Sequence, residues 1–181
     1  MEAEPTRLLL VEDDQDFAGL LTHVLSGSRE HPFNILHAGR LQEALDVLTK
    51  QLVDIVLLDL GLPDGHGLET FLRVNAHAPH IPIVILTALD NDAVANEAVA
   101  RGAQDYLVKG EAATKLLPRV LRYAIERKRA EEALREKASL EAMNRIMMNR
   151  EERILELKQE IDALLREFGR PAKYNVESRP H

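Results

Sequence analysis

The first 111 residues alternate between short apolar runs and segments with helical periodicity. Five runs rich in Leu, Ile and Val are short enough to be strands, and they span 7–11, 33–38, 54–59, 83–87 and 104–108. Between them, apolar residues recur on one helical face, which predicts helices at 15–26, 40–51, 67–76 and 91–101. Strands that are apolar on both faces and alternate with helices indicate a doubly wound, five-stranded parallel sheet covered on both sides.

The rest of the chain has the pattern of one long helix. From Lys115 to Phe168 it contains one proline, Pro118, no glycine, and many Ala, Glu, Leu, Lys and Arg residues, which favour helices. We expect Thr114 to be the N-cap and Gly169, followed by Pro171, to end the helix. Such a helix of about 54 residues would be roughly 80 Å long, too long to pack on one small domain.

The distal part of this segment carries a heptad pattern. Apolar residues, which we call the seam, follow alternating spacings of three and four: Leu140, Met143, Met147, Ile154, Leu157, Ile161, Leu164 and Phe168. Arg150 takes the one remaining core position. Ile and Leu alternating at the core positions favour a parallel two-stranded coiled coil, so we expect a homodimer through residues 140–168. The alternative is a helical hairpin with a break at Asn149, which resembles a capping residue, although no turn residue supports it.

Composition and charge narrow the function classes. The chain has no cysteine, which excludes disulfides and thiol chemistry, and no apolar run approaches the roughly 20 residues that cross a bilayer. The acidic N-terminus lacks the features of a signal peptide, so we expect a cytoplasmic protein without membrane insertion. Residues 1–111 hold 7 Lys and Arg against 18 Asp and Glu, a net charge of −11. The remainder holds 16 against 12, a net charge of +4, and the acidic half argues against nucleic acid as a partner.

Chemically useful side chains stand where the predicted strands end. Asp59 ends a buried run and is followed by a Gly/Pro turn in which Asp64 is expected to be a turn residue. Glu12-Asp13-Asp14, Thr87 and Lys109 follow three other strands. Ligands bind at the carboxyl ends of strands in open α/β sheets. An acid cluster, a hydroxyl and an ammonium at that edge suit a phosphoryl group bound together with a divalent metal.

Five separated elements occur in a characteristic order along the chain: Asp13-Asp14, Asp59, Thr87-Ala88, Tyr106 and Lys109. They make residues 6–129 similar to the receiver domain of two-component response regulators, the CheY-like family. The resemblance implies a flavodoxin-like (βα)5 fold with strand order 2-1-3-4-5, whose fifth helix here runs on into the coiled coil. It predicts four parts of the chain: an N-terminal tail (1–5), a receiver domain (6–129), a coiled-coil extension (130–169) and a flexible tail (170–181).

The family resemblance also implies a metal site around Asp59. Asp59 would be the phosphoacceptor nucleophile, with Mg²⁺ as the cofactor. Asp14, Asp59 and the backbone carbonyl of Gly61 would bind Mg²⁺ directly. Asp13, together with Glu12, would act mainly through water. Mg²⁺ prefers hard oxygen ligands and retains several waters, which fits this set.

The remaining roles implied by the family concern the phosphoryl group and the switch. Lys109 and the Thr87 hydroxyl would contact phosphoryl oxygens, and Tyr106 would rotate inward with Thr87 after phosphorylation. One position departs from the family pattern, because Lys109 is followed by Gly110 where proline in a cis peptide is usual. Glycine permits unusual backbone angles but does not lock them.

The sequence therefore predicts a response regulator that accepts a phosphoryl group from a histidine kinase and relays the signal through a dimeric coiled coil. It would be a phosphoacceptor rather than an enzyme. One alternative is a scaffold whose coiled coil docks a kinase independently of phosphorylation, and another is a phosphorelay intermediate. A phosphatase with an aspartyl nucleophile is disfavoured, because Gly61 occupies the position where such hydrolases carry their second aspartate.

Overall fold

The structure, a computed structural model, describes residues 4–27, 32–88 and 92–174. The ends of the two tails predicted at 1–5 and 170–181 lie outside these ranges. Contacts divide the chain into two compact units, 1–132 and 133–181, which we describe separately.

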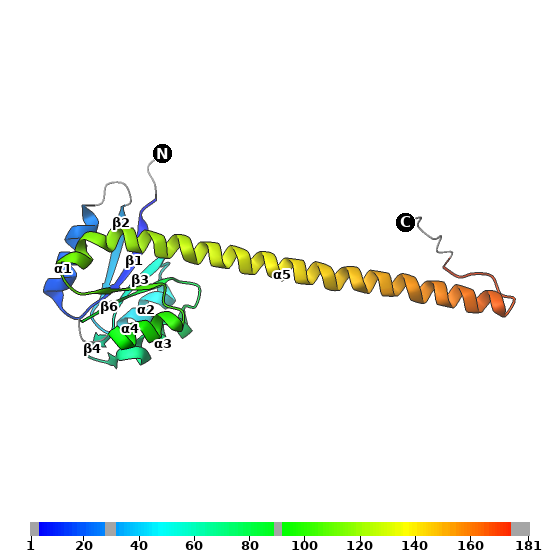
Figure 1. Cartoon of the computed structure of the whole chain (residues 1–181), viewed down its shortest axis with the longest axis horizontal. Coiled ribbons are helices and arrows are strands. Elements are labelled where there is room, and N and C mark those ends of the chain that lie inside the picture. Colours follow the sequence, from blue (N-terminus) through cyan, green and yellow to red (C-terminus); the bar gives the residue numbers. More distant parts are fainter. Residues whose placement is uncertain (1–3, 28–31, 89–91, 175–181) are drawn as a thin grey trace. The chain divides into compact units, whose positions relative to one another are not determined.

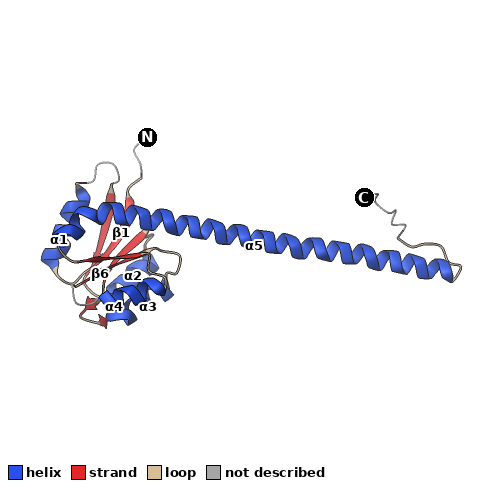
Figure 2. Ribbon diagram, in the orientation of Figure 1, coloured by secondary structure: helices blue, strands red, loops and turns tan. Residues whose placement is uncertain are grey.

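The predicted parallel sheet forms the centre of the first unit (Figure 2). Its strand order is β2-β1-β3-β6-β7, which is the predicted order 2-1-3-4-5, since β6 and β7 are the fourth and fifth strands of this sheet. The strands are β1 Thr6–Val11, β2 Phe33–Ala38, β3 Ile55–Asp59, β6 Ile83–Thr87 and β7 Asp105–Val108. Val11 lies opposite Leu58, and Thr87 lies opposite Val108, so the strands end at a common edge.

Helices cover both faces of the sheet (Figure 1). The four shorter ones begin and end within one residue of the predicted bounds: α1 Gln15–Ser26, α2 Leu41–Lys50, α3 Gly67–His77 and α4 Asp92–Ala100. A short antiparallel hairpin, β4 Gly61–Leu62 and β5 Gly65–His66, was not predicted. Its strands are too short to show an alternating pattern.

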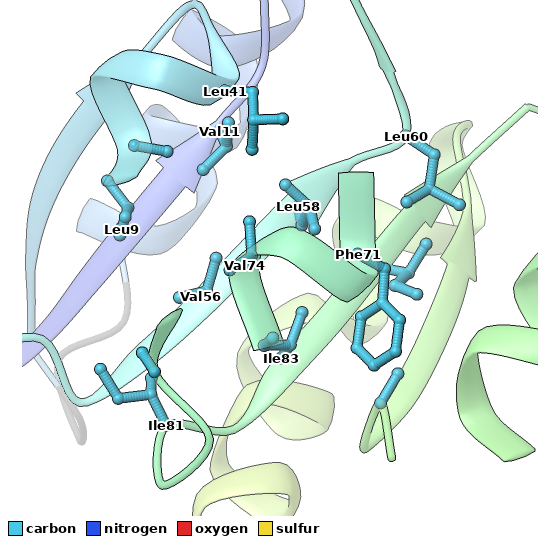
Figure 3. Packing of buried hydrophobic residues seen from close by; sticks show 14 of the residues in the cluster. Leu9, Val11, Leu41, Val56, Leu58, Leu60, Phe71, Val74, Ile81 and Ile83 are labelled. Atoms are coloured by element: carbon cyan, nitrogen blue, oxygen red, sulfur yellow. The ribbon is translucent and has the colours of Figure 1, made fainter. Parts of the chain in front are cut away.

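Alternate residues of each strand point into two separate cores. Leu9 and Val11 pack with residues of α2, α3 and α4, where Phe71 is the largest fully buried side chain (Figure 3). Leu8 and Leu10 face α1 and the first part of helix α5 (Glu111–Glu167), which buries Leu117, Leu121 and Ala124 in the second core. The apolar strands thus fix helices on both faces and leave the carboxyl edge for polar groups.

Helix α5 corrects two expectations from the sequence. It begins at Glu111, so Thr114 lies within the helix and is not its N-cap, and Pro118 falls in the second turn. Gly110, at φ 154°, leads from β7 directly into the helix, which is why the helix starts earlier than the capping pattern indicated. The alternative of a break at Asn149 is wrong, because the helix continues through this residue.

The second unit consists of the distal part of α5 and the residues that follow it. The predicted stop at Gly169 is confirmed: Gly169 has φ 68°, and the N–H of Arg170 donates to the Leu165 carbonyl at 2.8 Å. The chain then turns back, and the N–H groups of Lys173 and Tyr174 donate to Asp162 Oδ1 at 2.7 and 3.0 Å. Residues 170–174 are thereby bound to the end of their own helix.

No helix within the described parts of the chain combines the length and hydrophobicity that crossing a membrane requires.

Candidate functional site

Three carboxylates converge at the carboxyl edge of the sheet. Glu12 follows β1, and Asp59 is the last residue of the neighbouring β3, so the strand pairing brings them together with Asp13. One carboxylate oxygen from each of the three residues lies within 4.8 Å of the others. Glu12 is completely buried and Asp59 nearly so, whereas Asp13 is exposed. Carboxylates this close repel one another unless a cation lies among them.

Lys109 supplies one such cation. It directly follows β7, and its Nζ lies 2.9 Å from Glu12 Oε1 and 3.0 Å from Asp59 Oδ2. The same ammonium is 2.8 Å from Glu12 Oε2. The ring of Phe17, from α1, lies 5.2 Å away and covers the ammonium on another side. From its position directly after the edge strand β7, Lys109 therefore links Glu12, which follows β1, to Asp59, which ends β3.

The site perturbs the titration of both partners of this bridge. Burial raises the pKa of Glu12, and the Asp59 charge adds to this rise, although the hydrogen bond from Lys109 opposes it. Burial lowers the pKa of Lys109, but its hydrogen bonds to Glu12 and then Asp59 outweigh burial, so the pKa is raised overall. Lys109 is consequently a firmly charged ammonium at neutral pH.

Thr87 and Lys109 are joined through the backbone. The N–H of Lys109 donates to the Thr87 carbonyl at 2.8 Å, which continues the pairing between β6 and β7. The Thr87 side chain is buried, and its Oγ1 donates to the Ala88 carbonyl at 3.1 Å. This hydroxyl stands at the same edge as Asp59, because Asp59 pairs with Leu86 next to it.

Asp14 lies elsewhere than the sequence suggested. Its Oδ1 accepts hydrogen bonds from the N–H groups of Asp16 and Phe17 at 3.0 and 3.1 Å, so it is the N-cap of α1. The carboxylates that meet Asp59 are those of Glu12 and Asp13, one residue earlier than the expected pair Asp13 and Asp14. The physical reason is local: α1 begins at Gln15, which commits the preceding Asp14 to capping.

The other residues singled out from the sequence lie around this edge. Tyr106 is partly buried and packs against the first core. Gly61 lies beside the phosphoacceptor candidate, since a Cβ added to it would be 3.6 Å from Asp59 Oδ2. Sequence reasoning gave Glu12 a minor role and missed Phe17. The apolar run before Glu12 was the available signal for its burial.

The donor chemistry of the cluster suits a hard divalent cation. Glu12, Asp13 and Asp59 present carboxylate oxygens to a common point, and oxygen ligands are what Mg²⁺ prefers. A single ammonium cannot neutralise three carboxylates, so the site has charge available for a metal ion. The residues present therefore fit the magnesium ion that the resemblance implies.

A parallel five-stranded α/β sheet with this acid cluster, a hydroxyl and a lysine at its carboxyl edge agrees with the class of signalling receiver domains that the sequence indicated. The family described as response regulator receiver domain matches residues 8–121, and the chain belongs to this family.

Two relatives match part of this chain and part of their own length. The chain is 36% identical over 113 residues to the swarming motility regulation protein RssB of Serratia marcescens, which covers 62% of this chain and 50% of that protein. It is 35% identical over 104 residues to the KDP operon transcriptional regulatory protein KdpE of Escherichia coli, covering 58% and 44% respectively. The chain thus spans about half the length of these relatives. Because some of them are named as transcriptional regulators, they lend no support to the expected absence of a nucleic-acid partner.

Solved structures show the same fold. A response regulator receiver domain protein from Clostridium thermocellum matches with a TM-score of 0.57 and 25% identity, over 69% of this chain and 98% of that chain. NtrX from Brucella abortus matches with a TM-score of 0.63 and 25% identity, over 73% of this chain and 29% of that chain.

Replacing Asp13 by Asn should stabilise the protein in the absence of divalent cations, because it removes one of three mutually repelling carboxylates. The gain should be a rise of a few degrees at most in melting temperature, since Asp13 is exposed. Added Mg²⁺ should then stabilise the variant less than the wild type, as calorimetry can measure. The control is Asp16→Asn, which removes a carboxylate from the first turn of α1 and should lower stability slightly. Lower stability of Asp13→Asn without metal would contradict the repulsion.

Proposed function

We propose that the chain is a response regulator that takes a phosphoryl group from a histidine kinase onto Asp59. The observation that carries this proposal is the Asp59 carboxylate, 3.0 Å from the Lys109 ammonium and clustered with Glu12 and Asp13. In the transfer, an Asp59 oxygen bonds to phosphorus, the P–N bond of the donor phosphohistidine breaks, and the imidazole leaves. The product is an aspartyl phosphate, formed once per protein, so the protein acts as a phosphoacceptor rather than as an enzyme with turnover.

The residues of the site would each have a different role in phosphoryl transfer. Glu12, Asp13 and Asp59 would hold Mg²⁺, which when bound offsets the charge of the phosphoryl oxygens. Lys109 already lies on Asp59 and would contact a phosphoryl oxygen attached there, stabilising the charge that develops during transfer. Asp14 would act indirectly, by fixing the start of α1 and with it the backbone that carries Asp13.

Thr87 is suited to report the modification. Its hydroxyl donates to the Ala88 carbonyl, and a phosphoryl oxygen on Asp59 would offer a stronger, charged acceptor. Exchange of one acceptor for the other would pull the Thr87–Ala88 segment toward Asp59. Tyr106 packs against the first core beside β6 and would rotate into the space that Thr87 leaves. Phosphorylation would thus bias a two-state element.

Helix α5 is the proposed route by which the signal leaves the domain. Leucines of α5 are buried in the second core. In addition, Arg127 of this helix donates a hydrogen bond to the Gln104 carbonyl at 2.9 Å, just before β7. Lys128 donates another to the Pro79 carbonyl at 2.8 Å, ahead of β6. The helix is therefore hydrogen-bonded to the segments that lead into β6 and β7, and a shift of either segment would reach it.

The distal helix would engage a second copy of the chain in a parallel coiled coil. Seam residues are accessible in the single chain: Ile161 is 39% exposed, Leu164 55% and Phe168 77%. Fully burying an aliphatic side chain of this size contributes about 1.5–3 kcal/mol. The repeat of such residues over several turns gives a strong reason for dimerisation, and the relay would consist of a change in this coil's packing or register.

Asp59→Asn should abolish phosphorylation by a small-molecule donor such as phosphoramidate in the presence of Mg²⁺, because the amide is not a nucleophile. Intact-protein mass spectrometry should show one added phosphoryl group on the wild type and none on the variant. Asp54→Asn is the matched control, since Asp54 bonds Arg7 at the amino end of β3, and it should be labelled normally. Equal labelling of Asp59→Asn and the wild type would contradict the proposal.

Ile161→Glu should dissociate the dimer, because it places a charge at the centre of the seam. Light scattering on the full chain should give the mass of a dimer for the wild type and a monomer for the variant at low micromolar concentration. Leu155→Glu provides the control, as Leu155 is similarly exposed, at 47%, but lies outside the seam. A monomeric wild type would rule out the constitutive coil, and dissociation by both variants would rule out the seam as its interface.

A further inference from the structure

The loop that follows Asp59 is a compact hairpin rather than an open turn. β4 and β5 pair across two residues, with Gly61 opposite His66 and Leu62 opposite Gly65. The N–H of Gly67 donates to the Leu60 carbonyl at 2.8 Å and closes the base of the hairpin. Leu62 is fully buried, so the hairpin is anchored in the first core.

Asp64, at the tip of this hairpin, caps a helix that lies far away in the sequence. Its Oδ1 accepts from the Leu41 N–H at 2.7 Å, and its Oδ2 accepts from the Gln42 N–H at 3.0 Å. These are the first two residues of α2, whose own N-cap position, Arg40, provides no side-chain cap. The hydrogen bond from Gln42 is the largest cause of a lowered pKa for Asp64, which keeps this cap negatively charged at the positive end of the helix.

The contact between the hairpin and its neighbours is tight. A Cβ at Gly65 would stand 2.8 Å from both Leu41 Cδ2 and Thr70 Oγ1, closer than side chains tolerate. Glycine at this position therefore lets the hairpin approach α2 and α3. The close approach and the Asp64 cap act on adjacent residues and hold the tip of the hairpin to the first turn of α2.

The other arm of the hairpin belongs to the phosphoacceptor site. Gly61 lies two residues after Asp59, and a Cβ there would be 3.6 Å from Asp59 Oδ2 and 3.9 Å from Oδ1. The backbone of Gly61 is thus beside the acid cluster while Asp64 lies at the far end of the same hairpin. Contacts that hold the tip therefore add to the base hydrogen bond and the buried Leu62 in restraining the Gly61 backbone.

We propose that Asp64 is a positioning residue for the divalent cation of this site: by capping α2 it holds the hairpin so that the Gly61 carbonyl remains available beside Asp59. This inference rests on the proposed function, which places the cation there. Residues that orient metal ligands typically affect affinity by about 10- to 100-fold. Since Asp64 acts on one ligand of several, we expect the low end of this range.

The test is Mg²⁺ binding by the full chain, measured by isothermal titration calorimetry. Asp64→Ala should weaken binding about tenfold, and Asp64→Asn should recover most of the affinity, because an asparagine oxygen also caps helices well. In the metal-free protein, the amide resonance of Gly61 should shift in Asp64→Ala and return toward its wild-type position in Asp64→Asn. This second readout is independent of phosphorylation.

The matched control is Asp54→Ala, which removes the ion pair to Arg7, 2.8 Å long, at the opposite edge of the sheet. It should lower stability but leave Mg²⁺ affinity unchanged. Wild-type affinity in Asp64→Ala, or an equal loss in Asp54→Ala, would overturn the positioning role. Failure of the wild type itself to bind Mg²⁺ would instead overturn the proposed function and the inference with it. If Asp64→Ala does not fold, Asp64→Thr, which caps helices less well than asparagine, is compared with Asp64→Asn, and equal affinities would overturn the inference.

Discussion

The arrangement of the site depends on one ammonium held between two carboxylates. Lys109 reaches from the edge strand to Glu12 and Asp59, which the strand order places at the centre of the sheet. Burying two acids side by side is costly unless a cation compensates them. The lysine supplies that charge in the resting protein and stands where a phosphoryl group on Asp59 would need it. The same interaction therefore compensates the buried acids and would also serve the proposed phosphoryl transfer.

Around this charge, the fold positions the backbone with helix caps. Asp14 caps α1 and fixes the segment that carries Asp13, and Asp64 caps α2 from the hairpin that carries Gly61. Both carboxylates lie close to the site in sequence, yet both are bound to helix N–H groups. Acidic residues near the edge thus divide into those free to meet a cation and those that hold the loops in place.

Much of the fold could be predicted because its signals are local. Buried strands gave continuous apolar runs, and Asp59, Thr87 and Lys109 stood at their ends. What escaped prediction depends on geometry that sequence spacing does not encode. The sequence presents Asp13 and Asp14 as two equivalent acids. Their roles differ because α1 begins directly after Asp14, which becomes the N-cap of this helix. The cap from Asp64 to α2 joins residues 23 positions apart, which only the packed hairpin brings together.

The most direct test of the account is chemical mapping of the phosphorylated residue. Borohydride reduces an aspartyl phosphate to homoserine, which peptide mass spectrometry locates in the chain. After phosphorylation with Mg²⁺ present, the account predicts homoserine at position 59 and aspartate at positions 13, 14 and 64. Homoserine at another aspartate, a reduced glutamate, or phosphate that survives reduction on a hydroxyl or imidazole would contradict it.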